Sequence, residues 1–292
     1  MDQAEQLRNI IKAGNVKRSR PLARVITVTS GKGGVGKSNT AINLAIQFRK
    51  MGKKVVILDA DFGLANIEIM FGAVPKHNLS DLIYQGKNIK DIITWGPMEV
   101  GFISGGSGIT GLSNLSKDYL TYIVHNLAEL DTIADVIIVD TGAGISDAVL
   151  EFLVASGEIL LVTTPEPTSI TDSYSLLKAL NGHPGLERDN TQICMIANRV
   201  STANEGEVLF QKLDVVVSRY LKLPITYLGA VPQDPLLAKA VMQQLPVSLQ
   251  NPQARSAQAY EEIAAKLMKQ DEGQNTQKRG VAAFFSHIIG KK

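Results

Sequence analysis

The sequence predicts an α/β fold with a doubly wound, mostly parallel sheet and helices on both of its faces. Seven apolar runs of strand length recur between residues 22 and 270, and most are followed by sequence with helical period. Runs such as VVILD, VIIVD and ILLVT are apolar at successive positions, as expected of strands that are covered on both faces. Repeated alternation of strand and helix is typical of an open, doubly wound domain.

The predicted strands lie at 25–30, 54–59, 100–104, 135–140, 158–163, 192–198 and 226–229. With the intervening helical segments they form one predicted domain, residues 22–270. Residues 1–21 precede it as an arm that carries several basic side chains, and residues 280–292 follow it as a short amphipathic helix. The segment DEGQNTQKR at 271–279 is polar and has no apolar period, so we predict a linker there.

The composition excludes several classes of protein. The 292 residues are enough for a sizeable core, and they include a single cysteine, Cys194, which cannot close a disulfide within the chain or supply a cysteine-rich metal site. No run approaches the roughly 18 to 20 apolar residues that are needed to span a bilayer. We therefore expect a cytoplasmic protein in which Cys194 is a core residue.

A glycine-rich loop follows the first predicted strand and precedes a helical segment. Its residues are Gly31, Lys32, Gly33, Gly34, Val35, Gly36, Lys37 and Ser38, and Asn39 continues into the helix. This G-x-x-x-x-G-K-[ST] pattern turns backbone N–H groups towards a triphosphate and adds the positive end of the helix dipole. Lys37 is predicted to contact the β- and γ-phosphates, and the Ser38 hydroxyl to complete the shell of a Mg²⁺ ion. ATP and Mg²⁺ are therefore the expected cofactors, and a glycine-rich turn without a ligand is the alternative.

Lys32 adds a second cation to this loop, directly after its first glycine. The resulting sequence GKGGVGKS resembles the deviant Walker A motif of the MinD/ParA class of ATPases, and the resemblance covers nearly the whole chain. It implies a P-loop NTPase fold of the SIMIBI/MinD-like type and a homodimer that encloses ATP between its subunits. In that class the lysine contacts the phosphates of the opposite subunit, so the resemblance gives Lys32 the role of an arginine finger supplied in trans. A solvated loop lysine is the alternative.

Carboxylates end two of the predicted strands. Asp59 and Asp61 are spaced i, i+2 and therefore point the same way at the carboxyl edge of the sheet, where ligands bind in such folds. The resemblance implies that Asp61 orients the attacking water and that Asp59 supports Mg²⁺ through its outer shell. It also implies that Asp140 holds a Mg²⁺-bound water, while Gly142 and Gly144 let the following loop change conformation.

Recognition of the base rests on the resemblance alone. In the MinD/ParA class an asparagine at a strand end and the loop around a proline contact adenine. The matching residues here are Asn198, Pro232 and Asp234. A plain turn residue at the end of a strand is the alternative role for Asn198.

Two internal motifs narrow the resemblance to one branch of the class. DADFGLANIE and DTGAGIS resemble the FlhG family of flagellar number regulators, also called FleN or YlxH. MinD proteins usually have proline where this chain has Gly142, and ParA proteins usually have proline where this chain has Phe62. The N-terminal residues Asp2, Gln3, Ala4, Leu7 and Arg8 resemble a motif through which that family stimulates the GTPase FlhF, a signal-recognition-type protein. The alternative is an arm that packs on its own domain.

Five apolar residues form one helical stripe near the C-terminus: Val281, Phe284, Phe285, Ile288 and Ile289. A helix of this length, about 13 Å, is far shorter than the roughly 30 Å core of a bilayer, so it could lie on a membrane but not cross it. We expect it to bind the membrane when ATP is bound. Docking onto the protein's own core is the alternative, and it is also the arrangement expected of the resting state.

Together these features predict an ATP-dependent, dimerising and membrane-associating switch that hydrolyses ATP. By resemblance it regulates flagellar number and placement, and its expected partners are a second copy of the chain, an FlhF-type GTPase, flagellar switch-ring components and the inner face of the cell membrane. No specific nucleic acid is expected. The alternatives are a division-site ATPase of the MinD type, a DNA-segregation ATPase of the ParA type, and a scaffold that binds nucleotide without turnover.

Overall fold

The computed structural model describes residues 22–61, 66–105, 117–273 and 280–289. Eight strands form one sheet in the order β3-β4-β2-β5-β1-β6-β7-β8. All neighbouring strands are parallel except β3 and β4, so the predicted fold class is confirmed. The strands are β1 (Arg24–Thr29), β2 (Val55–Ala60), β3 (Thr94–Trp95), β4 (Gly101–Ser104), β5 (Val136–Thr141), β6 (Glu158–Thr163), β7 (Gln192–Val200) and β8 (Thr226–Pro232).

The strand order reverses at β1, which lies between β5 and β6. Loops that follow the strands on either side of such a reversal diverge and leave a crevice at the carboxyl edge. The glycine-rich loop follows β1 and therefore lies at this crevice. Asp59 and Asp140 are register partners in β2 and β5, so their side chains end neighbouring strands at the same level of the sheet.

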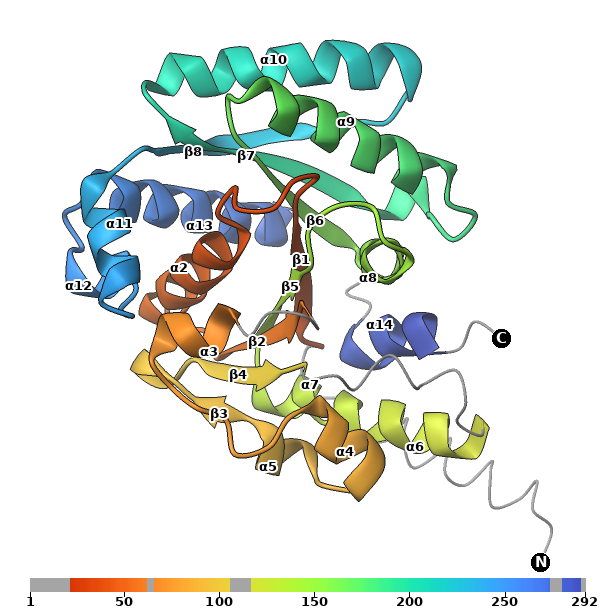
Figure 1. Ribbon diagram of the computed structural model, residues 1–292. Coiled ribbons are helices and arrows are strands. Elements are labelled where there is room, and N and C mark those ends of the chain that lie inside the picture. The colour runs from red at the N-terminus through yellow and green to blue at the C-terminus, as the bar shows by residue number, and fades with distance from the viewer. Residues whose placement is uncertain (1–21, 62–65, 106–116, 274–279, 290–292) are drawn as a thin grey trace, which may run out of the picture.

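Helices cover both faces of the sheet (Figure 1). One face packs against α2 (Lys37–Lys50), α3 (Asn66–Phe71), α11 (Pro235–Met242), α12 (Val247–Gln250) and α13 (Arg255–Gly273). The other face packs against α4 (Leu79–Gln85), α5 (Ile89–Ile92), α6 (Lys117–Ala128), α7 (Leu130–Ile133), α8 (Asp147–Ala155), α9 (Pro167–Gly182), α10 (Ala203–Tyr220) and α14 (Gly280–Ile289). Along β2, Val55 and Ile57 face the first set while Val56 and Leu58 face the second, which explains its uninterrupted apolar sequence.

Apart from shifts of up to three residues at the ends of strands, the structure differs from the sequence-based prediction at two places. The edge strand β3 was not predicted, because two residues are too few for any alternation to be visible. It pairs antiparallel with β4, and its Trp95 lies opposite Gly101. The helix α13 ends at Gly273, three residues into the segment that we predicted to be a linker; residues 274–279 lie outside the described residues.

Cys194 is buried in the core beneath α13. Burial raises the pKa of its thiol to about 12, with the charge of Glu158 adding to the effect. The thiol is therefore protonated at neutral pH, as expected of a core residue rather than a nucleophile.

Candidate functional site

The glycine-rich loop joins the end of β1 to the first turn of α2. Gly34 and Gly36 have φ angles of 75° and 100°, in the left-handed region that residues with a side chain rarely adopt. A Cβ atom on Gly36 would collide with the side-chain amide of Asn198, and one on Gly31 would collide with the backbone of Asp172 in α9. The glycines thus allow the loop to bend tightly against β7 and α9, and they leave its backbone free to approach phosphates.

Asp140 is a buried carboxylate beside Lys37 and Ser38 at the end of this loop. Both of its oxygens are buried, and neither accepts a well-aligned hydrogen bond from the residues that the structure describes, although the Ser38 hydroxyl lies close enough to favour the ionised form. Burial raises the pKa of Asp140 to about 6, against the opposing effects of Ser38 and the Lys37 ammonium. An unsatisfied buried carboxylate beside a hydroxyl fits the ligand set of a Mg²⁺ ion, which prefers oxygen ligands.

Two further carboxylates lie at the end of β2. Asp59 is buried and accepts hydrogen bonds from the backbone N–H groups of Asp61, at 3.1 Å, and Ile67, at 3.3 Å. Its pKa rises to about 7, mainly through burial and then through the charge of Asp140. Asp61 is only partly buried and lies beside Gly142, in the loop after β5, while the Asn66 amide donates to it at 3.4 Å. The structure therefore brings Asp59, Asp61 and Asp140 together next to the loop.

Without nucleotide and Mg²⁺, the free energy of unfolding is expected to fall as the pH rises from about 5 to 8. The folded-state pKa values of Asp59, about 7, and Asp140, about 6, lie above the ordinary value of 3.8. Over this range the folded protein consequently binds more protons than the unfolded chain, and stability decreases with rising pH. Replacing Asp59 with asparagine removes one buried charge and is expected to raise the free energy of unfolding at pH 8 by roughly 2 kcal/mol.

Denaturant unfolding of the nucleotide-free protein in EDTA measures both effects. Asp189→Asn, at an exposed position, is the matched control and should leave the pH dependence unchanged. A free energy of unfolding that rises between pH 5 and 8, or an Asp59→Asn protein no more stable than wild type at pH 8, contradicts this account of the carboxylates.

Lys32 is held within its own subunit. Its ammonium donates to Oε2 of Glu166, the residue just before α9, and to Oγ1 of Thr168 in the first turn of α9, both at 2.8 Å. The side chains of Lys32 and Glu166 are both exposed to solvent, and the ion pair lowers the pKa of Glu166. Sequence reasoning missed Glu166, because it lies 134 positions from Lys32 and no local motif marks it.

A cleft of about 510 Å³ lies beside the loop, between the ends of β7 and β8 and the start of α11. It is lined by Gly36, Asn39, Asn198, Arg199, Pro232, Gln233, Asp234, Pro235, Leu237, Ala238, Val241 and Met242. The three residues predicted to contact adenine thus line one cleft that reaches the loop. Arg199 was not predicted, and its backbone has a φ of 58° at the end of β7.

Two of these residues already have structural partners. The Asn198 amide donates to the Val35 carbonyl at 2.7 Å, which braces the loop from β7. Asp234 caps α11 by accepting from the backbone of Leu236, and its second oxygen accepts from Ser256. Contact of these side chains with a base stays a prediction, and their present bonds shape the wall of the cleft.

The helix α14 packs on the protein itself, against α6, α7, α8 and the start of β1. Val281, Phe284 and Phe285 are buried, and the rings of Phe284 and Phe152 lie 6.0 Å apart. Ile288 is partly buried in the same cluster, while the side chain of Ile289 lies outside the described residues. This is the arrangement that we expect of the resting state.

Asp131, in the first turn of α7, connects α14 to the start of the domain. Its Oδ1 accepts hydrogen bonds from the backbone of Ala23, at 3.0 Å, and of Val281, at 3.1 Å. Gly280 has a φ of 64°, and a Cβ atom there would lie 3.1 Å from the Leu22 side chain. The start of α14 and the segment that enters β1 are therefore held at one point.

The N-terminal residues Asp2, Gln3, Ala4, Leu7 and Arg8 lie outside the described residues, so their role stays a prediction. Within the part of the chain that the structure describes, no helix is both long enough and apolar enough to cross a membrane.

A strand, a glycine-rich loop and a helix, flanked by carboxylates at two neighbouring strand ends, define a P-loop nucleotide-binding protein. Residues 21–268 match the ParA family model, described as NUBPL iron-transfer P-loop NTPase. The chain therefore belongs to the ParA/MinD family of P-loop NTPases.

Similar proteins agree with this assignment. The antiactivator FleN of Pseudomonas aeruginosa is 38% identical over 84% of this chain and 86% of its own. The flagellum site-determining protein YlxH of Helicobacter pylori is 32% identical over 99% of this chain and 98% of its own. Among solved structures, the septum site-determining protein MinD of Pyrococcus horikoshii, complexed with Mg-ADP, superimposes with a TM-score of 0.68 at 24% identity, covering 86% of this chain and 98% of its own.

Proposed function

We propose that the chain is an ATP-hydrolysing switch that closes into a homodimer around ATP. The observation that carries this proposal is the meeting of opposite charges at the carboxyl edge of the sheet: the Lys37 ammonium acts on the buried carboxylate of Asp140, and the carboxylates of Asp59 and Asp61 lie close to it. Phosphoryl transfer needs positioned charge more than strong base chemistry, and this arrangement supplies it.

In this proposal the loop backbone and Lys37 hold the triphosphate, and Asp61 orients the attacking water. The water oxygen bonds to the γ-phosphorus as the bond to the bridging oxygen of ADP breaks, which releases ADP and inorganic phosphate. Ser38 and Asp140 would hold Mg²⁺, and Asp59 would support the ion through its outer shell. When it is bound, the ion neutralises phosphate charge. The loop after β5, with Gly142 and Gly144, is free to relax once the γ-phosphate has gone.

Dimerisation completes each site. Lys32 leaves Glu166 and Thr168, which hold it in the single subunit, and reaches the phosphates of the partner subunit. The exposed ion pair between Lys32 and Glu166 contributes little to stability, so breaking it costs little. Charge-assisted hydrogen bonds from the Lys32 ammonium to phosphate oxygens are stronger, so the exchange is favourable when ATP is present. The monomer is accordingly a weak ATPase.

Membrane binding follows from the release of α14. ATP-driven dimerisation frees the helix from Asp131 and exposes its stripe of Val281, Phe284, Phe285, Ile288 and Ile289 to the inner face of the cell membrane. One such helix binds weakly, but a dimer carries two, and avidity adds a factor of about 10² to 10⁴.

Control of flagellar number and placement is the biological output that the relatives support, since they are named an antiactivator, FleN, and a flagellum site-determining protein, YlxH. We assign the N-terminal arm the stimulation of an FlhF-type GTPase, and we assign flagellar switch-ring components as further partners. No sequence-specific contact with nucleic acid is part of this proposal.

GTP hydrolysis by the FlhF-type GTPase of the same organism tests the role of the arm. The intact protein and a peptide of residues 1–20 are expected to stimulate hydrolysis, and a protein lacking those residues is not. A peptide with Leu7→Asp is the matched control, because it keeps the length and most of the sequence but loses a central apolar side chain. If neither the protein nor the peptide stimulates, the arm has no such role and a division-site ATPase becomes the better assignment.

A further inference from the structure

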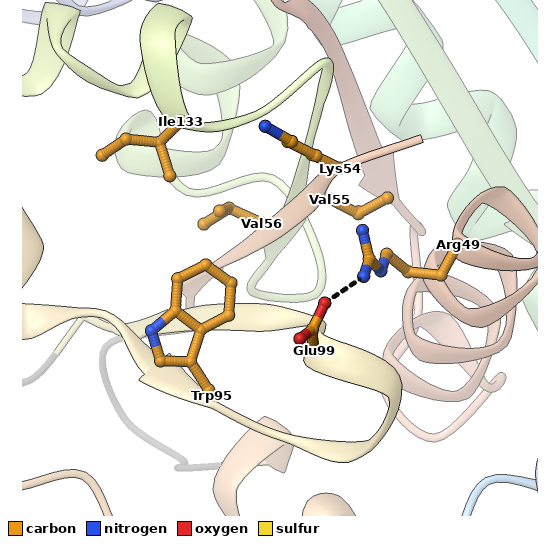
Figure 2. Close-up of a pocket in the computed structure, with 7 residues that line it drawn as sticks. All are labelled: Arg49, Lys54, Val55, Val56, Trp95, Glu99 and Ile133. Carbon is orange, nitrogen blue, oxygen red and sulfur yellow. Dashed lines mark hydrogen bonds and ion pairs between the residues drawn. The ribbon is translucent and has the colours of Figure 1, made fainter. Parts of the chain in front are cut away.

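A second cleft lies at the opposite edge of the sheet from the nucleotide site. Its volume is about 460 Å³, and it opens between the start of β2, the hairpin of β3 and β4, the end of α2, and α7. Val55, Val56 and Ile133 provide apolar lining; Figure 2 shows Trp95 on the same side of β2 as Val56 and Ile133, whereas Val55 lies on the side of Arg49. Because β2 begins at Val55 and runs towards Asp59, this cleft and the nucleotide site lie at opposite ends of the same strand.

Trp95 is held in place although it is 55% exposed. It lies opposite Gly101 in the antiparallel pair, and a Cβ atom on Gly101 would lie only 3.2 Å from the indole ring. The glycine therefore leaves room for the ring to lie on the neighbouring strand. A large aromatic side chain that is fixed but half exposed loses little freedom on binding, which is a property of residues that dominate protein interfaces.

The turn that leads from Trp95 into β4 adopts a rarely populated backbone conformation. Met98 and Glu99 have φ angles of 55° and 57°, in a region that residues other than glycine seldom adopt. Arg49, near the end of α2, secures the turn by donating to the Met98 carbonyl at 2.8 Å and by pairing with Glu99 at 2.7 Å. Strained backbone persists where the surroundings enforce it, and such sites are often functional.

The lining of the cleft carries one cation that the described acids do not neutralise. Arg49 and Lys54 are the cations and Glu99 is the acid among the described residues that line it, and Arg49 pairs with Glu99. The Lys54 ammonium makes no ion pair with any described side chain. Its backbone is fixed, because its N–H donates to Asp135 at 2.8 Å and its carbonyl accepts from Asp135 and Val136.

We propose that this cleft is a docking site for an acidic peptide segment of a partner protein. An apolar side chain of the segment lies between Trp95, Val56 and Ile133, and a neighbouring carboxylate pairs with Lys54. Charge complementarity selects an acidic segment over a basic one. The half-exposed ring suits a side chain presented by a larger partner, whereas small ligands are usually enclosed on most sides.

Trp95 is the single tryptophan of the chain, so intrinsic fluorescence reports on this cleft directly. The test titrates the nucleotide-free, full-length protein with three probes: the acidic hexapeptide EDLFDE, the basic hexapeptide KKLFKK, and AMP. We expect a saturable change in tryptophan emission with the acidic peptide alone. An equal response to the basic peptide, or a response to AMP without one to the acidic peptide, overturns the proposal.

Anisotropy of a labelled acidic peptide then assigns the contacts without relying on Trp95 emission. Lys54→Glu and Trp95→Ala are each expected to weaken binding roughly tenfold or more. Lys212→Glu, on the exposed face of α10, makes the same change in net charge and should leave affinity within about twofold. Unchanged ADP binding shows that each variant is folded. Full affinity in folded Lys54→Glu, or equal losses in Lys54→Glu and Lys212→Glu, contradicts the assignment.

Discussion

An Asp61→Ala protein is expected to lose ATP turnover by a factor of about 10² to 10³ while it still forms the ATP-bound dimer. Asp61 lies after the carboxyl end of β2, beside Gly142. It is therefore not part of the glycine-rich loop, whose backbone and Lys37 are proposed to hold the phosphates. Removing it takes away the group that orients the water, but it leaves Lys37, Ser38 and Lys32 in place. Phosphate release measures turnover, and light scattering of the ATP-loaded protein measures its mass.

The neighbouring Asn66→Ala variant is the matched control for Asp61→Ala. The Asn66 amide reaches Asp61 only at 3.4 Å, so its removal should change turnover by less than about tenfold. If Asp61→Ala is monomeric with ATP, or hydrolyses ATP at the wild-type rate, the role proposed for Asp61 is wrong.

A Lys32→Ala protein is expected to bind ATP but to lose the dimer, and with it turnover by a factor of about 10³ or more, as when a trans-acting cation is withdrawn. In the single subunit the hydrogen bonds of the Lys32 ammonium to described residues go to Glu166 and Thr168, so the substitution removes an exposed ion pair and should leave stability nearly unchanged. Lys37→Ala, in the same loop, is expected to lose ATP binding itself, which separates the two lysines.

Mixing the Lys32→Ala and Asp61→Ala proteins distinguishes a trans from a cis role for Lys32. In a mixed dimer the Lys32→Ala subunit keeps its own Asp61 and receives Lys32 from its partner, so one working site is restored. The rate of phosphate release by the mixture should then exceed the sum of the rates of the two proteins measured separately. If the mixture shows no gain although mixed dimers form, Lys32 acts within its own subunit.

The central strands and the loop could be predicted because their signals are local. VVILD and VIIVD are apolar throughout since both faces of β2 and β5 are covered, and the loop pattern needs only eight consecutive residues. The two-residue strand β3 carries no such pattern, and the cleft beside it depends on four separate segments.

Contacts between distant segments could not be predicted from the residue pattern. Lys32 and Glu166 are 134 positions apart, and nothing in either stretch alone indicates that they pair. Likewise, the stripe on α14 fits a membrane surface and a protein core equally well, because both bury apolar side chains. In the structure α14 packs on α6 and α8 and buries Val281, Phe284 and Phe285, so the membrane role depends on its release.

The most direct test of the central claim is flotation of the protein with anionic liposomes in ATP or in ADP. We predict that the Asp61→Ala protein floats with ATP and stays at the bottom of the gradient with ADP. A version of it that ends at residue 279 should remain dimeric with ATP and no longer float. Flotation that is equal in ATP and ADP, or that persists without residues 280–292, would contradict an ATP-controlled release of α14.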